Sequence, residues 1–284
     1  MTDMPNEALL AQLEEVARTV ATEAARYVVD DRPDHLGVAR TKSSATDVVT
    51  VMDQGAQDLI RARLHELRPD DAFLGEEEGG SAGDSGLTWV VDPIDGTVNY
   101  LYRIPSYAVS VAVVVGDPRV PGQWTPVAGA VANPVSGEVF HARRGGGAWL
   151  SASDGSQRRL AIESPPDLDH ALVGTGFGYA VDRRRWQAAV LLDVLPQIRD
   201  IRRIGSAALD ICAVADGHLD AYFERGLNPW DMAAAWLVLA EAGGTFTGLA
   251  GGPPDEWMVV AAAEPLHGQL EIVLRDAAEA AGEE

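Results

Sequence analysis

The stretch Trp89–Asn99 constrains the fold most strongly, because an apolar run ends there in two carboxylates. The paired valines after the tryptophan are typical of a buried strand, and Pro93 predicts that this strand ends there, since proline cannot donate to a β-ladder. Gly96 permits a sharp turn after the second carboxylate. Thr97 would then cap a helix, whose free backbone N–H groups suit an anion.

Two interpretations of this stretch stay open from its local sequence. Asp92 and Asp95 at a strand end, beside a possible phosphate-binding turn, favour metal-assisted phosphate chemistry. The pattern Asp-Pro-x-Asp-Gly is also ordinary turn chemistry, with aspartate favoured at its first position and glycine at its last. The rest of the chain has to decide between a turn and a site.

Composition restricts the class of protein and its partners. The 284 residues are 46% hydrophobic and 23% charged, as in an ordinary globular protein, and the formal net charge is −21. This acidity disfavours nucleic acid or an anionic membrane as the main partner, since both bind clustered basic residues. A phosphate substrate would be repelled too, unless bound divalent cations reversed the local sign.

The single cysteine, Cys212, lies in an apolar stretch and predicts a buried structural thiol in a reducing cytoplasm. The acidic N-terminal region lacks the basic and apolar segments of a signal peptide. Apolar runs are all shorter than the roughly 20 residues that a membrane span needs. We therefore expect a cytoplasmic protein that does not bind membranes.

Helical and strand patterns alternate along the chain, without strict βαβ repetition. Helical periodicity predicts helices over residues 6–29, 54–67, 186–194, 206–216, 230–242 and 266–281. Apolar, β-branched runs predict strands over residues 48–52, 73–74, 89–91, 106–115, 127–131, 138–142, 148–150, 171–175, 219–223, 245–247 and 258–262. We expect an α/β (α+β) fold, a layered sandwich with mixed sheets covered by helices. The polar segment 151–169 predicts a linker between two halves, approximately 1–150 and 170–284, of a single catalytic domain.

Further acids follow or open the predicted elements. Asp53 ends the strand 48–52 or serves as the N-cap of the next helix. Glu76 lies after a short strand, in an acidic loop bracketed by glycines that would otherwise be simply solvated. Asp231 lies in the first turn of a helix, where it would complement the helix dipole or complete a capping box. Together with Asp92 and Asp95, these are oxygen ligands that suit Mg²⁺, whereas the scarcity of histidine disfavours Zn²⁺.

These motifs resemble the signature of the inositol monophosphatase family, in its order and spacing over essentially the whole chain. Residues 202–210 and 219–222 look like the branch of bacterial inositol-1-monophosphatases. The resemblance implies a layered αβαβα sandwich of the sugar-phosphatase type. The matching residues are Lys42-Ser43-Ser44, Val49-Thr50, Asp53, Gly75-Glu76-Glu77, Asp92-Pro93-Ile94-Asp95-Gly96-Thr97, Trp230-Asp231, Ala233, Ala234 and Glu241-Ala242-Gly243-Gly244.

The resemblance also implies an activity and a site. It implies a Mg²⁺-dependent inositol-1-monophosphatase that releases myo-inositol and phosphate by direct attack of a metal-activated water, with two or three Mg²⁺ per site. No candidate nucleophile with a base partner is visible in the sequence, which supports direct hydrolysis. The implied metal ligands are Glu76, Asp92 and the carbonyl of Ile94 for the first ion, Asp92, Asp95 and Asp231 for the second, and Glu76 through water for a third. The implied catalytic residues are Glu76 and Thr97, the latter linked to Asp53, which would position and deprotonate the attacking water. The implied substrate-binding residues are Gly96, Thr97, Gly205, Ser206, Ala207 and Glu224.

Alternatives remain within the family and outside it. Glu78 extends the usual acidic pair, and we choose Glu76 as the ligand from its place after Gly75. Histidinol-phosphate, fructose-1,6-bisphosphate and adenosine 3′,5′-bisphosphate phosphatases share the metal core, although few arginines near Gly205 favour a monophosphate. A catalytically idle regulatory or interaction protein is the alternative from another class. The resemblance further implies a small phosphorylated polyol as the partner, inhibition by Li⁺ and a homodimer.

Overall fold

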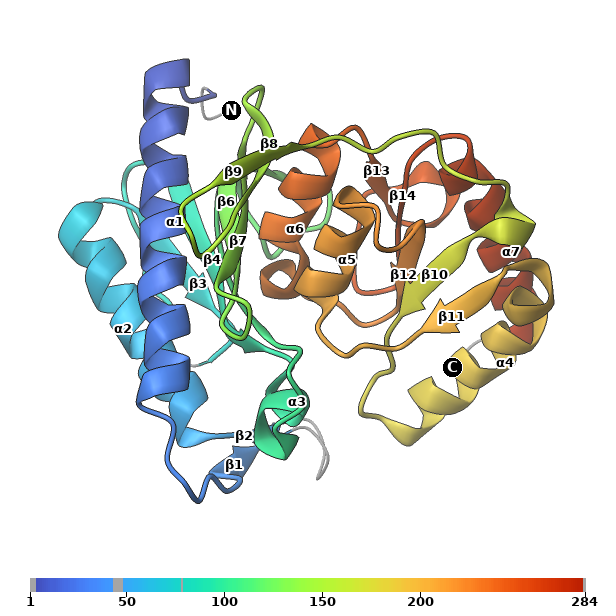
Figure 1. Ribbon diagram of the computed structural model, residues 1–284, viewed down its shortest axis with the longest axis horizontal. Helices are drawn as coiled ribbons and strands as arrows, with labels where there is room; N and C mark the ends of the chain where they lie inside the picture. Colours follow the sequence, from blue (N-terminus) through green and yellow to red (C-terminus); the bar gives the residue numbers. More distant parts are fainter. Residues whose placement is uncertain (1–3, 43–47, 78, 283–284) are drawn as a thin grey trace.

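Two β-sheets and the helices on their faces make up the described chain, residues 4–42, 48–77 and 79–282, in a computed structural model (Figure 1). The helices are α1 (Glu7–Asp30), α2 (Val51–Leu67), α3 (Thr97–Tyr102), α4 (Val181–Val194), α5 (Ala207–Ala215), α6 (Pro229–Glu241) and α7 (Leu266–Ala281). The strands are β1 (Arg40–Thr41), β2 (Val48–Val49), β3 (Ala72–Gly75), β4 (Leu87–Asp95), β5 (Ala108–Gly116), β6 (Trp124–Asn133), β7 (Glu138–Arg143), β8 (Gly147–Ser151), β9 (Gln157–Leu160), β10 (Leu172–Thr175), β11 (Asp200–Arg202), β12 (Ala221–Glu224), β13 (Thr245–Thr247) and β14 (Val259–Ala262).

The larger sheet has the strand order β3-β4-β5-β6-β7-β8-β9, and the smaller one β11-β10-β12-β14-β13. In the larger sheet β3 is parallel to β4 and the other pairs are antiparallel. In the smaller sheet β10 is parallel to β11 and to β12, whereas β14 runs antiparallel. Both sheets are therefore mixed, as expected.

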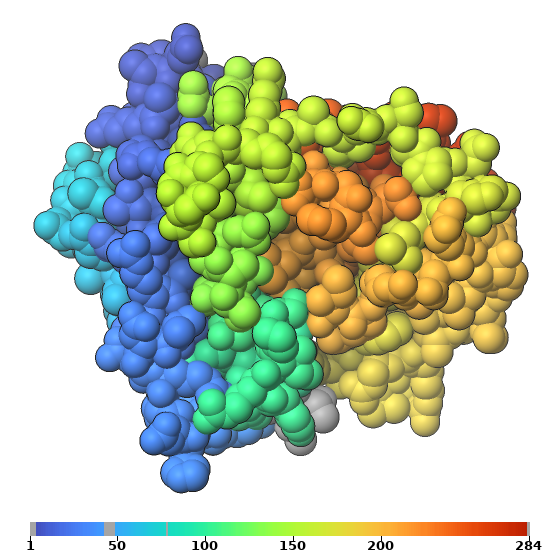
Figure 2. All heavy atoms as spheres, in the orientation of Figure 1, coloured from blue at the N-terminus to red at the C-terminus, as the bar shows by residue number. Residues whose placement is uncertain are grey.

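The sheets and helices stack in five layers (Figure 1). The helices α1 and α2 cover the outer face of the larger sheet, α5 and α6 lie between the sheets, and α4 and α7 cover the outer face of the smaller sheet. Figure 2 shows the two halves in contact along the middle of one face of the molecule. The αβαβα sandwich that the resemblance implied is confirmed.

The central layer is apolar because it packs against a sheet on each side. Helix α6 has buried residues around its circumference, as expected for a helix between two sheets. Its approach to β6 is close: a Cβ added at Gly129 would lie 3.1 Å from the Cα of Ala234. Small residues on both surfaces thus bring the start of α6 beside the end of β4, which positions the site.

Helix α1 is amphipathic, and its apolar stripe is buried against the larger sheet. Leu13, Val20 and Ala24 are fully buried. Asn6 is its N-cap, and the Asn6 side chain accepts a hydrogen bond of 3.0 Å from the backbone N–H of Leu9. Most of this helix's stability therefore comes from the sheet that it covers.

The predicted end of the strand at Pro93 is wrong. Strand β4 continues through Pro93 to Asp95, and its register against β5 shifts between Asp92 and Asp95. A bulge of this kind takes the intervening residues out of the ladder, so the missing N–H of proline costs no hydrogen bond.

Two further expectations are corrected by long-range pairing. The strand predicted over 48–52 is short, because Thr50 caps α2 and the helix already begins at Val51. The segment 151–169, expected to be a linker, contains β9, which pairs with β8 and extends the larger sheet. The exposed, charged β9 is an edge strand, and its polar composition concealed it.

Within the described residues, every helix is too short or too polar to cross a bilayer. The predicted burial of Cys212 is confirmed, because its side chain is fully buried in α5.

A matched pair of leucines tests how the apolar stripe of α1 contributes to stability. Leu13→Ala, in a fully buried position, should lower the free energy of unfolding by about 2–5 kcal/mol in urea titrations. Leu192→Ala is the same substitution on α4, where the side chain is 75% exposed. It should change the free energy of unfolding by less than about 0.5 kcal/mol. Equal effects of the two substitutions would contradict the packing described.

Candidate active site

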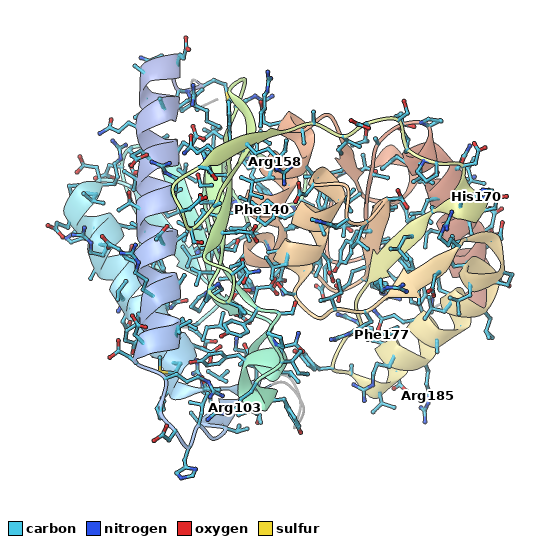
Figure 3. All side chains as sticks on the ribbon, viewed as in Figure 1. Arg103, Phe140, Arg158, His170, Phe177 and Arg185 are labelled. Carbon is cyan, nitrogen blue, oxygen red and sulfur yellow. The ribbon has the colours of Figure 1, made fainter. Side chains whose placement is uncertain are left out.

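A cavity of about 400 Å³ opens between the two halves of the molecule. It lies where the carboxyl ends of the parallel pair β3 and β4 face those of β10 and β12. In Figure 3, Phe177 lies in the loop after β10, at the edge of the second half that faces the first. Because both sheets end here, residues far apart in the chain line one space.

Three carboxylates meet in this cavity. Asp92, Asp95 and Asp231 each offer one oxygen, and these oxygens lie within 4.8 Å of one another. The bulge at the end of β4 turns the first two toward the start of α6, which carries the third. The turn and the site are thus the same stretch, and the sequence alternatives for Trp89–Asn99 do not exclude each other.

Asp231 has a capping role as well as a place in this cluster. Its Oδ2 accepts a hydrogen bond of 2.6 Å from the backbone N–H of Asn228, which completes the capping box predicted at the start of α6. This hydrogen bond restrains the rotamer of Asp231, so that the Asp231 carboxylate can cap the helix and also face Asp92.

The cluster is electrostatically unfavourable without a cation. Burial, together with the charges of Glu76, Asp95 and Asp231, raises the pKa of Asp92 well above its ordinary value. Burial and the nearby acids also raise the pKa of Asp231. Burial raises the pKa of Asp95 as well, against the opposing hydrogen bonds of Ser206 and Ala208. A divalent cation would remove this repulsion and hold all of these groups ionised.

Glu76 follows β3 and lines the cavity, whereas the neighbouring Glu77 does not. Glu77 is buried and pairs with Arg40 and Lys42 instead. This arrangement supports the choice of Glu76 from its place after Gly75; Glu78 lies outside the described residues.

Lys42 is a site residue to which the sequence analysis gave no role. Its Nζ lies 2.6 Å from Oε1 of Glu76 and 2.6 Å from Oε1 of Glu77. Burial lowers the pKa of Lys42, but Glu76 and Glu77 together raise it by more than burial lowers it. The ammonium therefore stays charged. A signal was present in the sequence: this is the chain's one lysine, and every other strongly basic residue is arginine.

Asp53 and Thr97 form a hydrogen-bonded pair beside the cluster. The Thr97 hydroxyl donates to Oδ1 of Asp53 at 2.9 Å and lies 3.0 Å from the carbonyl oxygen of Ile94. Burial raises the pKa of Asp53 to about 6, although its hydrogen bonds to Thr50 and Thr97 oppose this.

Two local expectations about this pair are corrected. Asp53 is not the N-cap of α2: it is the third helical residue and closes a capping box with Thr50. Thr97 is not a cap either, because Gly96, with φ of 95°, is the N-cap of α3. The left-handed backbone at Gly96 places Thr97 inside the helix, where its hydroxyl turns toward Asp53.

The segment Gly205–Ala208 attaches α5 to the cluster. The Ser206 hydroxyl donates to Oδ2 of Asp95 at 2.6 Å, and the backbone N–H of Ala208 donates to the same oxygen at 2.7 Å. Ala207 donates more weakly to Oδ1, at 3.3 Å. Ser206 is fully buried, so its hydroxyl orients Asp95, while Gly205 and Ala207 contribute to the cavity wall.

Glu224, at the end of β12, lines the cavity on the side of the second half. Burial raises its pKa to about 7, while its hydrogen bond from Tyr222 and the charge of Arg203 lower it. Asp210, which the sequence analysis did not assign to the site, lines the same wall, and burial raises its pKa to about 8. Its signal in the sequence was ambiguous, since an acid in the first turn of α5 also complements the helix dipole.

Comparisons with known proteins agree with this geometry. The sequence model of the inositol monophosphatase family matches residues 9–280. The inositol-1-monophosphatase of Mycobacterium bovis is 47% identical over 257 residues, which cover 86% of this chain and 85% of that protein. A relative from Pasteurella multocida named Nus factor SuhB is 38% identical over 214 residues, with 75% and 76% covered. The solved structure of Mycobacterium tuberculosis SuhB superposes with a TM-score of 0.78 at 43% identity, over 94% of this chain and 97% of that one. The chain therefore belongs to the inositol monophosphatase family.

Proposed function

We propose that this protein is a Mg²⁺-dependent phosphatase of small phosphorylated polyols, with inositol 1-phosphate as its first candidate substrate. The observation that carries the proposal is the cluster of Asp92, Asp95 and Asp231 in a cavity between the two sheets. The cavity volume of about 400 Å³ suits a small substrate. Family membership and the name of the Mycobacterium bovis relative support the reaction class.

The residues present fit magnesium. Mg²⁺ prefers a few carboxylate oxygens and retained waters, and the cluster offers oxygen ligands alone. We propose Glu76, Asp92 and the carbonyl of Ile94 as one ligand set, Asp92, Asp95 and Asp231 as a second, and Glu76 through water for a third ion. The raised pKa values of Asp92 and Asp231 support this assignment, because burial and neighbouring carboxylates disfavour their charged forms and a cation would favour them.

The bound cation would act as a Lewis acid that neutralises the phosphate and acidifies an attacking water. Asp53 accepts a hydrogen bond from the Thr97 hydroxyl, which would direct the lone pairs of that hydroxyl away from Asp53 and toward a water. Above pH 6 Asp53 is ionised and holds this orientation. Glu76 would accept a proton from the same water, and the backbone N–H groups of Gly96 and Thr97 would bind phosphate oxygens. Glu224 would accept hydrogen bonds from the polyol.

A second candidate is a regulatory or interaction protein that kept the fold, which the name of the Pasteurella multocida relative favours. The preserved carboxylate cluster supports the enzyme. Histidinol-phosphate and fructose-1,6-bisphosphate phosphatase activity stay alternatives within the family. The homodimer, the cytoplasmic location and the inhibition by Li⁺ stay predictions. Sedimentation at low protein concentration would test whether the protein is a homodimer.

A phosphate-release screen tests the proposed activity. With Mg²⁺, we expect turnover of inositol 1-phosphate to exceed that of histidinol phosphate, fructose 1,6-bisphosphate and adenosine 3′,5′-bisphosphate. Asp95→Asn should abolish it in a folded protein, while Asp84→Asn, at an exposed position outside the cavity, should not. Full activity in the Asp95 variant would remove this site from consideration, and no turnover of any substrate, together with a stable protein partner, would favour the regulatory alternative.

The acid cluster also predicts how stability depends on pH and magnesium. In EDTA, the melting temperature should fall as pH rises from 6 to 8. Asp53, Glu224 and Asp210 have folded pKa values of about 6, 7 and 8, above their ordinary values, so the folded state binds more protons than the unfolded state in this range. Mg²⁺ should raise the melting temperature at pH 8.

Asp92→Asn provides the control for that experiment. It removes the charge at the centre of the repulsion, so it should raise the melting temperature in EDTA and cancel most of the increase caused by Mg²⁺. A variant that is less stable in EDTA, yet still stabilised by Mg²⁺, would contradict the assignment of Asp92.

The Thr97–Asp53 pair predicts a contrast between two substitutions. Thr97→Val keeps the shape but removes the hydroxyl, and should lower kcat by about 100-fold with little change in KM. Thr97→Ser keeps the hydroxyl within reach of Asp53 and should retain most of the activity. Steady-state kinetics at saturating Mg²⁺ would measure both, and equal losses in the two variants would point to a packing role.

A further inference from the structure

Tyr222 and Glu224 occupy alternate positions of β12, so both side chains point to the same face of the smaller sheet, toward α5. Tyr222 is fully buried in the apolar layer between the sheets. Glu224 is only partly buried and lines the cavity. The tyrosine ring is thus fixed by the core, while the carboxylate that it reaches is available to a ligand.

The tyrosine holds one particular oxygen of the glutamate. The Tyr222 hydroxyl donates a hydrogen bond to Oε2 of Glu224. This bond lowers the pKa of Glu224 against the effect of burial, so it favours the charged, accepting form. Fixing Oε2 restricts the carboxylate to an orientation in which Oε1 is the oxygen left for a ligand.

A glycine on the neighbouring strand provides the space for this orientation. Gly176 directly follows β10, which runs parallel to β12 with Thr175 opposite Phe223. A Cβ at Gly176 would overlap the carboxyl group of Glu224, both oxygens included. The obstacle would be the end of a flexible side chain, so an alanine here would displace the carboxylate without disturbing the backbone.

We propose that Tyr222 and Gly176 are positioning residues that together hold Glu224 in the orientation that recognises the hydroxyl groups of the substrate alcohol. The inference rests on the proposed function and deepens it: it makes hydroxyl recognition at this wall the source of selectivity for a polyol phosphate over a phosphate ester without hydroxyls. Neither residue touches the substrate in this proposal. The proposed metal ligands belong to β4, α6 and the residue after β3, and neither Tyr222 nor Gly176 is among them, so phosphate binding should stay unchanged.

The test compares two substrates in the Mg²⁺-loaded protein: inositol 1-phosphate, which has ring hydroxyls, and p-nitrophenyl phosphate, which has none. Tyr222→Phe removes the donor and keeps the ring, and Gly176→Ala displaces the carboxylate from the other side. Each should lower the ratio of kcat/KM for inositol 1-phosphate to that for p-nitrophenyl phosphate by about tenfold. The change should appear in KM for the inositol ester, with kcat for the aryl ester retained.

The matched control is Tyr100→Phe, which also removes a buried hydroxyl, one that donates to the carbonyl oxygen of Val28 at 2.8 Å. It should lower stability without changing the substrate ratio. If the ratio stays unchanged in both Tyr222→Phe and Gly176→Ala, with aryl ester turnover intact, the inference is wrong but the proposed function is not. The same conclusion would follow if each variant lost activity equally on both esters. Absence of Mg²⁺-dependent hydrolysis of either ester by the unaltered protein would overturn the proposed function and the inference with it.

Discussion

The repulsion among buried carboxylates at the junction of the two sheets is the constraint on which the rest of the structure depends. Asp92, Asp95 and Asp231 lie close together, the first two buried and the third half-buried, where like charges interact strongly. The surroundings hold them in place: a bulge turns the end of β4, a capping box fixes Asp231, and the start of α5 donates hydrogen bonds to Asp95. This arrangement of the carboxylates would allow a divalent cation to supply the opposite charge.

The layered architecture explains how these residues come together. The acids belong to β4 and α6, elements far apart in the chain, and only the close packing of α6 on the larger sheet unites them. That packing depends on small residues, Gly129 on β6 and Ala234 on α6. The second sheet then closes the cavity with the ends of β10 and β12. A buried helix between two sheets is therefore what makes one site from two halves.

Charge is distributed unevenly within this cavity. In a chain of net charge −21, both walls carry acids, but they are supported differently. Glu76 has the ammonium of Lys42 at 2.6 Å, whereas Glu224 accepts a hydrogen bond from the hydroxyl of Tyr222 and is influenced by the charge of Arg203. The cluster of Asp92, Asp95 and Asp231 could bind a cation, whereas the lining near Glu224 also includes Arg183 and Arg203.

Local sequence determined the helices, most of the strands and the capping of α1 and α6, because periodicity and caps act within a few residues. It also marked the acids, since their order and spacing match a known family. The resemblance also implied the link between Thr97 and Asp53, but only the tertiary structure decided that β4 passes through Pro93 and that β9 extends the sheet. It likewise decided that Lys42 forms an ion pair with Glu76 and that Asp210 lines the cavity. These outcomes depend on pairing and packing between distant segments, for which a single sequence carries no local signal.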